Sequence, residues 1–198
     1  QGQLWVGLDH GAAAGKQAVA LLVIDNPRNL APRIWVLDCH VAEGRTTPED
    51  DARTILEMLA RNGCKYDDVD GWVGDRSVGR ARWDVDKSNK ELREFLAHEL
   101  RRPVRQTKFI ETPKKWSGSV LYGFRLINAV MARRDSDGGS NFRIHPRCRE
   151  LVDAIKTFNG DSRHPGKDVL DAVRYPIEAA VRRAGSSWMA GGVVAAYS

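Results

Sequence analysis

The sequence predicts an α/β fold with a mixed β-sheet at its centre. Three apolar segments near the amino terminus (4–9, 18–24 and 33–41) are separated by turn-forming residues, which indicates an antiparallel meander. A helical segment then leads to a fourth apolar segment, 69–75. Because a helix that connects two strands of one sheet makes a right-handed crossover, the fourth strand can lie parallel beside the first.

Length and composition fit one domain that buries a core. Of the 198 residues, we expect 1–185 to form this domain and 186–198 to form a carboxyl-terminal tail. The longest apolar run, 18–24, has seven residues, whereas a membrane-spanning helix needs about 20. We therefore expect no transmembrane segment, no signal peptide and no membrane partner.

Cysteine content and charge limit the function classes only broadly. The three cysteines lie far apart and include no C-x-x-C pair, so we expect neither a disulfide framework nor a structural zinc site. A reducing, intracellular compartment is therefore expected. A net charge of +5, from 31 Lys and Arg against 26 Asp and Glu, permits a polyanionic partner such as nucleic acid without identifying one.

Start and stop signals define the first helix. Thr47 is expected to cap it, with Pro48 as its first residue and Asp50 completing a capping box. Apolar residues then recur on one face, and Gly63 is expected to end the helix.

A second capping box, Ser88 with Glu91, predicts another amphipathic helix that ends before Pro103. In segment 104–109, apolar residues alternate with basic ones. We expect this segment to form a fifth strand at an edge of the sheet.

The rest of the chain is predicted to be mainly helical. The expected elements are a helix over 112–134, a glycine-rich loop over 135–140, an extended piece over 142–145, a helix over 146–158 and a final helix over 167–184. Pro176 lies inside the final helix, and we expect it to kink that helix or shift its register.

Acidic residues occur where this topology brings chain segments together. Asp9 ends the first strand and Asp75 ends the fourth, so parallel pairing places both at one sheet edge. Asp168 and Asp171 are three residues apart and share a face of the final helix. Carboxylates that converge in this way repel each other unless a cation is present, and Mg²⁺ and Mn²⁺ prefer such oxygens. Two ions about 3.5–4 Å apart can activate water and stabilise the leaving oxygen of a phosphodiester.

Each acid also has a structural interpretation. An aspartate at the end of a strand often hydrogen-bonds the backbone of a turn, which applies to Asp9 and Asp75. Asp168 lies near a helix start, where it can stabilise the helix dipole or cap amides. Asp171 lies among apolar neighbours, although an amphipathic helix can also expose a single acid there.

Four basic residues near these acids are candidates for DNA contact: Lys16, Arg76, Arg80 and Arg82. They would bind phosphate without reading bases, which makes binding strongly salt-dependent. The alternative is an ordinary solvated face or turn.

Three further residues flank the acids in sequence: His10, His164 and Lys167. They could support the metal ligands by hydrogen bonds, and the two histidines could handle protons. Adjacency in sequence does not establish which way these side chains point.

Three stretches resemble the acidic motifs of the nuclease domain of tailed-phage terminase large subunits. They are W-V-G-L-D-H-G at 5–11, W-V-G-D-R-S at 72–77 and K-D-V-L-D-A-V-R-Y at 167–175, of which the last is the most specific. The resemblance implies a ribonuclease H-like fold. We therefore expect a mixed five-stranded sheet of three antiparallel and two parallel strands, flanked by helices, with an extra hairpin-like segment.

The resemblance also implies an activity. Such domains are metal-dependent endonucleases that cut concatemeric double-stranded phage DNA with little sequence preference, using Mg²⁺ or Mn²⁺. By position, Asp9 would bridge two ions, Asp75 would bind one and Asp171 would bind from the final helix, whereas relatives vary at Asp168. The implied partners are a packaging ATPase domain, the small terminase subunit and the portal, in the cytoplasm of the infected host cell.

Three other functions fit parts of the pattern. Holliday-junction resolvases share the fold and the acid pair on the last helix. Actin-like and sugar-kinase ATPases also carry an Asp-x-Gly motif in their first hairpin, but they need two such domains. The third alternative is a nuclease-dead module for DNA binding or assembly.

Overall fold

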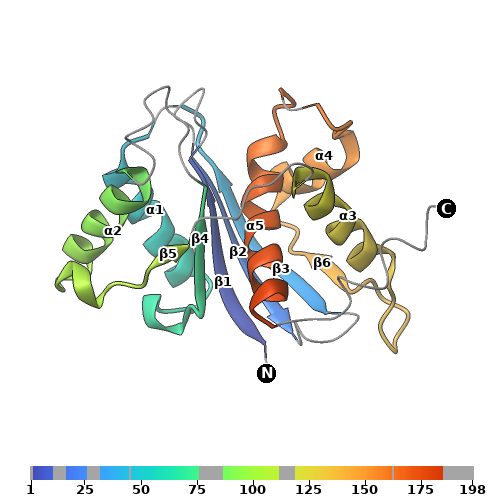
Figure 1. The fold of residues 1–198 in the computed structure, drawn as a ribbon, viewed down its shortest axis with the longest axis horizontal. Helices are drawn as coiled ribbons and strands as arrows, with labels where there is room; N and C mark the ends of the chain where they lie inside the picture. The colour runs from blue at the N-terminus through green and yellow to red at the C-terminus, as the bar shows by residue number, and fades with distance from the viewer. Residues whose placement is uncertain are drawn as a thin grey trace.

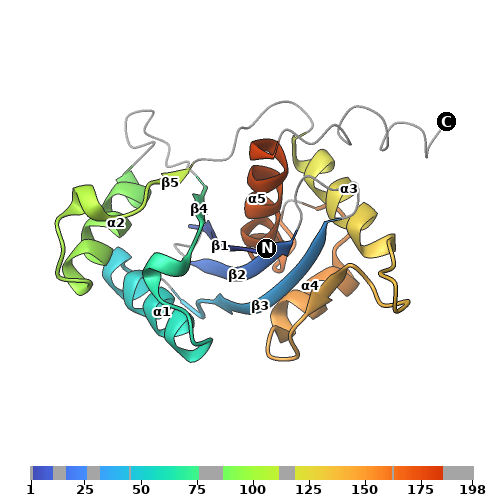
Figure 2. The same ribbon diagram turned by 90° about the horizontal axis from the view of Figure 1, so that it is seen from below.

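A six-stranded mixed sheet lies at the centre of the computed structural model, with helices on both faces (Figures 1 and 2). The structure describes residues 2–10, 17–25, 32–44, 46–75, 87–111, 119–161 and 163–184. The strands are β1 (Gln3–Asp9), β2 (Ala18–Asp25), β3 (Arg33–Val41), β4 (Gly71–Gly74), β5 (Ile110–Glu111) and β6 (Phe142–Ile144). Their order across the sheet is β5-β4-β1-β2-β3-β6.

The strand pairing confirms the predicted topology around β1. The first three strands form the antiparallel meander. β4 pairs parallel to β1, with Leu8 opposite Gly74. The amide of Asp75 extends this ladder by donating to the carbonyl oxygen of Leu8 at 3.0 Å. Asp9 and Asp75 therefore lie at the same edge of the sheet.

The predicted strand over 104–109 is wrong. The chain forms a 3₁₀ turn at Val104–Gln106, which the Thr107 hydroxyl closes by donating to the carbonyl oxygen of Val104 at 2.6 Å. Phe109 then points outward and is 69 % exposed. The fifth strand is the short β5, which pairs parallel to β4.

The segment expected as an extra hairpin-like piece joins the main sheet. Arg134 and Ser140 form an isolated antiparallel bridge, and the chain then continues into β6, which pairs parallel to β3. The sheet therefore has six strands rather than the expected five.

In the described part of the chain, five α-helices cover the sheet in two layers. They are α1 (Pro48–Arg61), α2 (Lys87–Glu99), α3 (Ser119–Ala132), α4 (Arg149–Thr157) and α5 (Lys167–Arg183). α1 and α2 cover one face, and α3, α4 and α5 cover the other (Figure 2). Neighbouring residues of β1 alternate between the two cores, since Trp5 packs with α5 and Val6 with α1. This explains why β1 is an almost unbroken apolar run.

Helix starts agree with the predictions to different degrees. The Thr47 hydroxyl accepts from the amide of Asp50 at 3.2 Å, which confirms the predicted capping box. α2 begins at Lys87, one residue before the predicted cap Ser88, and α4 begins three residues after Pro146. The predicted helix start at 112–118 lies outside the described residues. No helix within the described ranges is long and apolar enough to span a membrane.

α5 crosses β1 at unusually close range. The helix continues through Pro176, the residue at which the sequence predicts a kink or a shift in register. Because proline has no amide hydrogen, the carbonyl of Ala172 loses its usual partner within the helix. Gly7 lies against this point, where an added Cβ would overlap the Ala172 oxygen and come within 2.5 Å of Pro176 Cγ. The glycine therefore lets α5 approach the strand that carries Asp9.

Candidate active site at the carboxyl edge of β1 and β4

Three aspartates from separate elements meet between the sheet edge and α5. Asp9 is the last residue of β1 and is buried, and Asp75 directly follows β4. Asp171 lies in the second turn of α5 and is only 1 % exposed. The close contact of α5 with β1 at Gly7 brings the helix acid to the strand acids.

The hydroxyl of Tyr175 marks the point where these carboxylates meet. Its oxygen lies 3.1 Å from Oδ2 of Asp75 and 3.3 Å from Oδ2 of Asp171. Burial raises the pKa of this hydroxyl, and the negative charges of Asp171, Asp9 and Asp75 raise it further. Tyr175 therefore remains protonated at neutral pH and can donate to the carboxylates.

Lys167 places a positive charge in the same cluster. Its Nζ lies 2.6 Å from Oδ2 of Asp171, one helical turn away. Burial alone would lower the pKa of Lys167, but the hydrogen bond and charge of Asp171 outweigh it and raise the pKa. The charges of Asp9 and Asp168 act in the same direction. Asp168 is half-buried in the first turn of α5.

Arg174 holds the other oxygen of Asp171. Its Nε lies 2.9 Å from Oδ1 of Asp171, and its Nη1 lies 2.7 Å from Oε1 of Glu178. All three side chains are buried. Burial alone would lower the pKa of Arg174, but the two carboxylates outweigh it and raise the pKa. The arginine therefore stays charged and fixes the orientation of Asp171.

Arg174, Tyr175 and Glu178 are site residues that the sequence analysis missed. The signal available was their spacing from Asp171, since residues three, four and seven positions apart share a helix face. The resemblance motif contains Arg174 and Tyr175 but assigns them no contact. Burial of charged side chains cannot be read from that motif.

The donor set suits a hard divalent cation. Mg²⁺ and Mn²⁺ prefer carboxylate oxygens, and the cluster already attracts the Lys167 ammonium. Within the described ranges, however, no three His, Cys, Asp or Glu side chains are arranged as a ready metal cage. Lys167 and Arg174 each engage one oxygen of Asp171. An ion bound by Oδ2 would therefore share that oxygen with Lys167 and Tyr175 or displace one of them.

The two candidate histidines lie in different places. His10 faces the α1 and α2 side of the sheet, where it contacts Gln17 and Asn89 rather than the acids. His164 packs edge-on against Phe158 and accepts from the amide of Gly166 at 3.1 Å. These described contacts of His164 support the loop that leads into α5.

The predicted DNA contacts Lys16, Arg76, Arg80 and Arg82 lie outside the described residues. The predicted tail, 186–198, also lies outside them.

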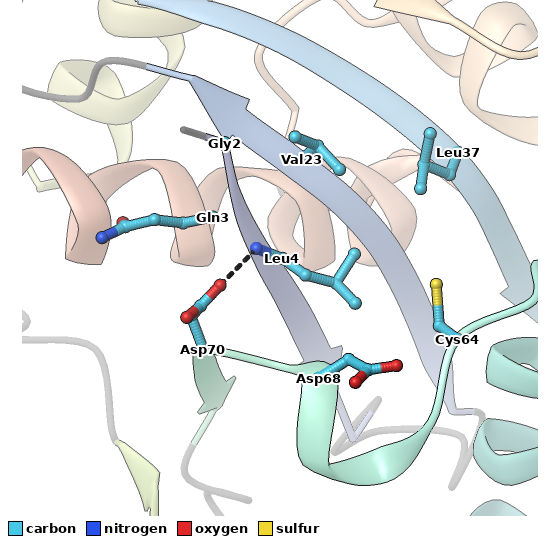
Figure 3. Close-up of a pocket in the computed structure, with 8 residues that line it drawn as sticks. All are labelled: Gly2, Gln3, Leu4, Val23, Leu37, Cys64, Asp68 and Asp70. Carbon is cyan, nitrogen blue, oxygen red and sulfur yellow. Dashed lines mark hydrogen bonds between the residues drawn. The ribbon is translucent and has the colours of Figure 1, made fainter.

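A separate pocket of about 640 Å³ lies at the opposite end of β1 (Figure 3). Its lining includes the carboxylates of Asp68 and Asp70 and the thiol of Cys64. Asp70 accepts from the amide of Leu4 at 2.8 Å, and Asp68 accepts from the amide of Lys65 at 2.7 Å. These acids therefore stabilise local backbone at the amino ends of the strands, away from the Asp9 edge.

Comparison with known proteins supports the fold through structure alone. No protein-family model matches the chain, and no curated protein matches it significantly. Among solved structures, the large terminase (g2p) nuclease domain of bacteriophage SPP1 with bound Mn aligns with a TM-score of 0.55 at 18% identity, over 89% of this chain and 86% of that one. RuvC of Thermus thermophilus aligns with a TM-score of 0.44 at 12% identity, over 93% of this chain and 98% of that one. The chain therefore has the ribonuclease H-like fold, as the SPP1 terminase nuclease domain does.

Proposed function

We propose that this chain is a divalent-metal-dependent endonuclease that hydrolyses double-stranded DNA with little sequence preference. The observation that carries the proposal is the meeting of Asp9, Asp75 and Asp171 at one sheet edge. A ribonuclease H-like fold with a Mn-bound nuclease as structural neighbour supports the same activity.

The residues divide the work by position. Asp9, Asp75 and Asp171 would hold the metal, and Asp168 would contribute from the first turn of α5. A bound Mg²⁺ or Mn²⁺ site of one or two ions would supply activation of a water molecule and stabilisation of the leaving oxygen of the phosphodiester. Arg174 orients Asp171 by a hydrogen bond to its Oδ1. The Tyr175 hydroxyl contacts both Asp171 and Asp75 and so holds the two carboxylates close together.

The biological role follows from the same proposal. The substrate is concatemeric phage DNA, which a terminase cuts during genome packaging in the cytoplasm of the host. Lys16, Arg76, Arg80 and Arg82 are proposed to contact its phosphates. The proposed partners are the packaging ATPase domain, the small terminase subunit and the portal.

Plasmid nicking in Mn²⁺ tests the activity. Asp9→Asn and Asp171→Asn should each abolish nicking, because each replaces a charged ligand by a neutral amide of similar shape. Asp153→Asn is the matched control, since Asp153 is exposed on α4. Circular dichroism should confirm that all three variants are folded. Wild-type activity in either Asp9→Asn or Asp171→Asn would refute the proposal.

The choice of DNA substrate separates the remaining alternatives. The proposed nuclease cuts linear duplex and supercoiled plasmid. Symmetric cutting of four-way junctions, with linear duplex left intact, would instead identify a junction resolvase. Retention of DNA without cleavage in any divalent ion would identify a binding module.

A further inference from the structure

Three hydrogen-bonded polar side chains, Gln17, His10 and Asn89, lie on the face of the sheet opposite to the proposed metal ligands. His10 is the central one of the three, on the face covered by α1 and α2. Its Nδ1 is 2.9 Å from Oε1 of Gln17, the residue before β2. Its Nε2 is 2.7 Å from Oδ1 of Asn89, in the first turn of α2. Asn89 then reaches the next strand, because its Nδ2 donates to the carbonyl oxygen of Gly74 at 3.2 Å.

The geometry defines what Asn89 donates and accepts. Its amide nitrogen is used by the carbonyl of Gly74, so its oxygen faces His10 and accepts a hydrogen from Nε2. Asn89 is only 6 % exposed. An added Cβ at Gly74 would overlap its side-chain oxygen, so the strand and the asparagine are in close contact.

The two groups that Asn89 joins are direct chain neighbours of proposed metal ligands. His10 follows Asp9, and Gly74 precedes Asp75. Among the described residues, the last backbone hydrogen bond between β1 and β4 is the one that the amide of Asp75 donates to the carbonyl oxygen of Leu8. The asparagine bridge therefore lies where the two strand ends leave the sheet.

We propose that Asn89 is a positioning residue that fixes the separation of Asp9 and Asp75 by tying His10 to the Gly74 carbonyl. This inference rests on the proposed metal-binding function. Asn89 reaches neither acid itself, because it acts from the opposite face of the sheet. Groups that hydrogen-bond metal ligands directly typically contribute 10- to 100-fold to metal affinity, and we take this range as the expected size of the effect.

Isothermal titration calorimetry with Mn²⁺ tests the role directly on the full chain. Asn89→Ala should weaken Mn²⁺ binding roughly 10- to 100-fold. Asn62→Ala is the matched control, because Asn62 also bridges two segments by donating to Asp38 at 2.7 Å and to the carbonyl of Met58 at 2.8 Å. It lies at the end of α1, so it should lower the free energy of unfolding while leaving the Mn²⁺ affinity within about twofold.

His10→Ala provides a second route if Asn89→Ala does not fold. His10 borders a pocket of about 220 Å³, so water can enter the space left by its ring. The bridge predicts weaker Mn²⁺ binding in His10→Ala as well. It also predicts that the double variant binds Mn²⁺ no more weakly than the weaker-binding single variant, because both changes break one link. Additive losses, or an unchanged Mn²⁺ affinity in either folded single variant, would overturn the positioning role.

Mn²⁺ binding by the wild-type protein distinguishes failure of this inference from failure of the proposed function. If the wild type binds Mn²⁺ and Asp171→Asn does not, the metal site stands and only the Asn89 results decide the inference. If the wild type binds no Mn²⁺, the proposed function and the positioning role both fail.

Discussion

The phenolic oxygen of Tyr175 lies 3.1 Å from Oδ2 of Asp75, although the two residues are 100 positions apart. The same oxygen lies 3.3 Å from Oδ2 of Asp171. This hydroxyl therefore links the end of β4 to α5 at the point where the proposed metal ligands meet. Because its pKa is raised by burial and by the surrounding carboxylates, it remains a donor at neutral pH.

Tyr175→Phe tests this link. Removing the hydroxyl takes one buried hydrogen-bond donor away from Asp75 and Asp171, so the free energy of unfolding without metal should fall by about 1.5–3 kcal/mol. Added Mn²⁺ should reduce this deficit, because the ion neutralises the same carboxylates. Urea unfolding with and without Mn²⁺ measures both effects.

Tyr66→Phe is the control. It removes the hydroxyl that accepts from the amide of Lys108 on the other face of the sheet, so its loss of stability should not depend on Mn²⁺. Equal Mn²⁺ dependence of the two deficits would contradict the link.

Arg174→Met should be strongly destabilising. It leaves Asp171 and Glu178 buried without their shared cation, and breaking a buried pair in this way typically reduces stability by about 3–5 kcal/mol. Adding Glu178→Gln should restore part of the loss, because one of the two buried charges is then removed. Denaturant unfolding measures both variants, with Arg149→Met on the exposed face of α4 as control. A loss no larger than that of the control would show that Arg174 does not stabilise this cluster.

Gly7→Ala should separate the strand from the helix. The added methyl group overlaps the Ala172 carbonyl, so we expect a loss of about 1–3 kcal/mol in stability. Nicking should also fall, because α5 carries Asp171 away from Asp9 when it shifts. Gly44→Ala is the matched control, since an added Cβ there meets no atom within 4 Å. Thermal unfolding and plasmid nicking check the pair, and full stability in Gly7→Ala would contradict the close packing.

Asp38 should make stability depend on pH. Burial alone would raise its pKa, but hydrogen bonds from Arg61 and Asn62 and the charges of Arg61 and Arg147 outweigh burial and hold the pKa below 3.8. Because the folded-state pKa is depressed, the stabilisation is present above pH 3.8 and is lost as the pH falls through the folded-state pKa. Asp38→Asn should therefore be less stable than wild type by roughly 1.5–3 kcal/mol at pH 7.

The difference between Asp38→Asn and wild type should shrink as the pH falls below about 3.8. Urea unfolding at pH 7 and in acid measures it, with Asp153→Asn as an exposed control that changes little at either pH. A difference that stays constant with pH would rule out the depressed pKa of Asp38 as its cause.

The sequence by itself determined the elements whose signals are local. The apolar run of β1, the Thr47 capping box and the long α5 are encoded by neighbouring residues, and the structure has them close to the predicted bounds. The parallel placement of β4 beside β1 also followed, because a helical crossover leaves few alternatives. Aspartates at the ends of two strands and on one helix were therefore recognisable as a candidate metal site.

Only the tertiary structure decided which groups surround those acids. Arg174, Glu178 and Tyr175 became part of the site because α5 packs against Gly7 and buries them, and burial depends on contacts between distant segments. The same reason applies to β5 and β6, whose few residues gain strand geometry from the neighbouring strands β4 and β3 rather than from their own pattern. The partners of His10 also depended on the tertiary structure, because Asn89 lies on α2, 79 positions further along the chain.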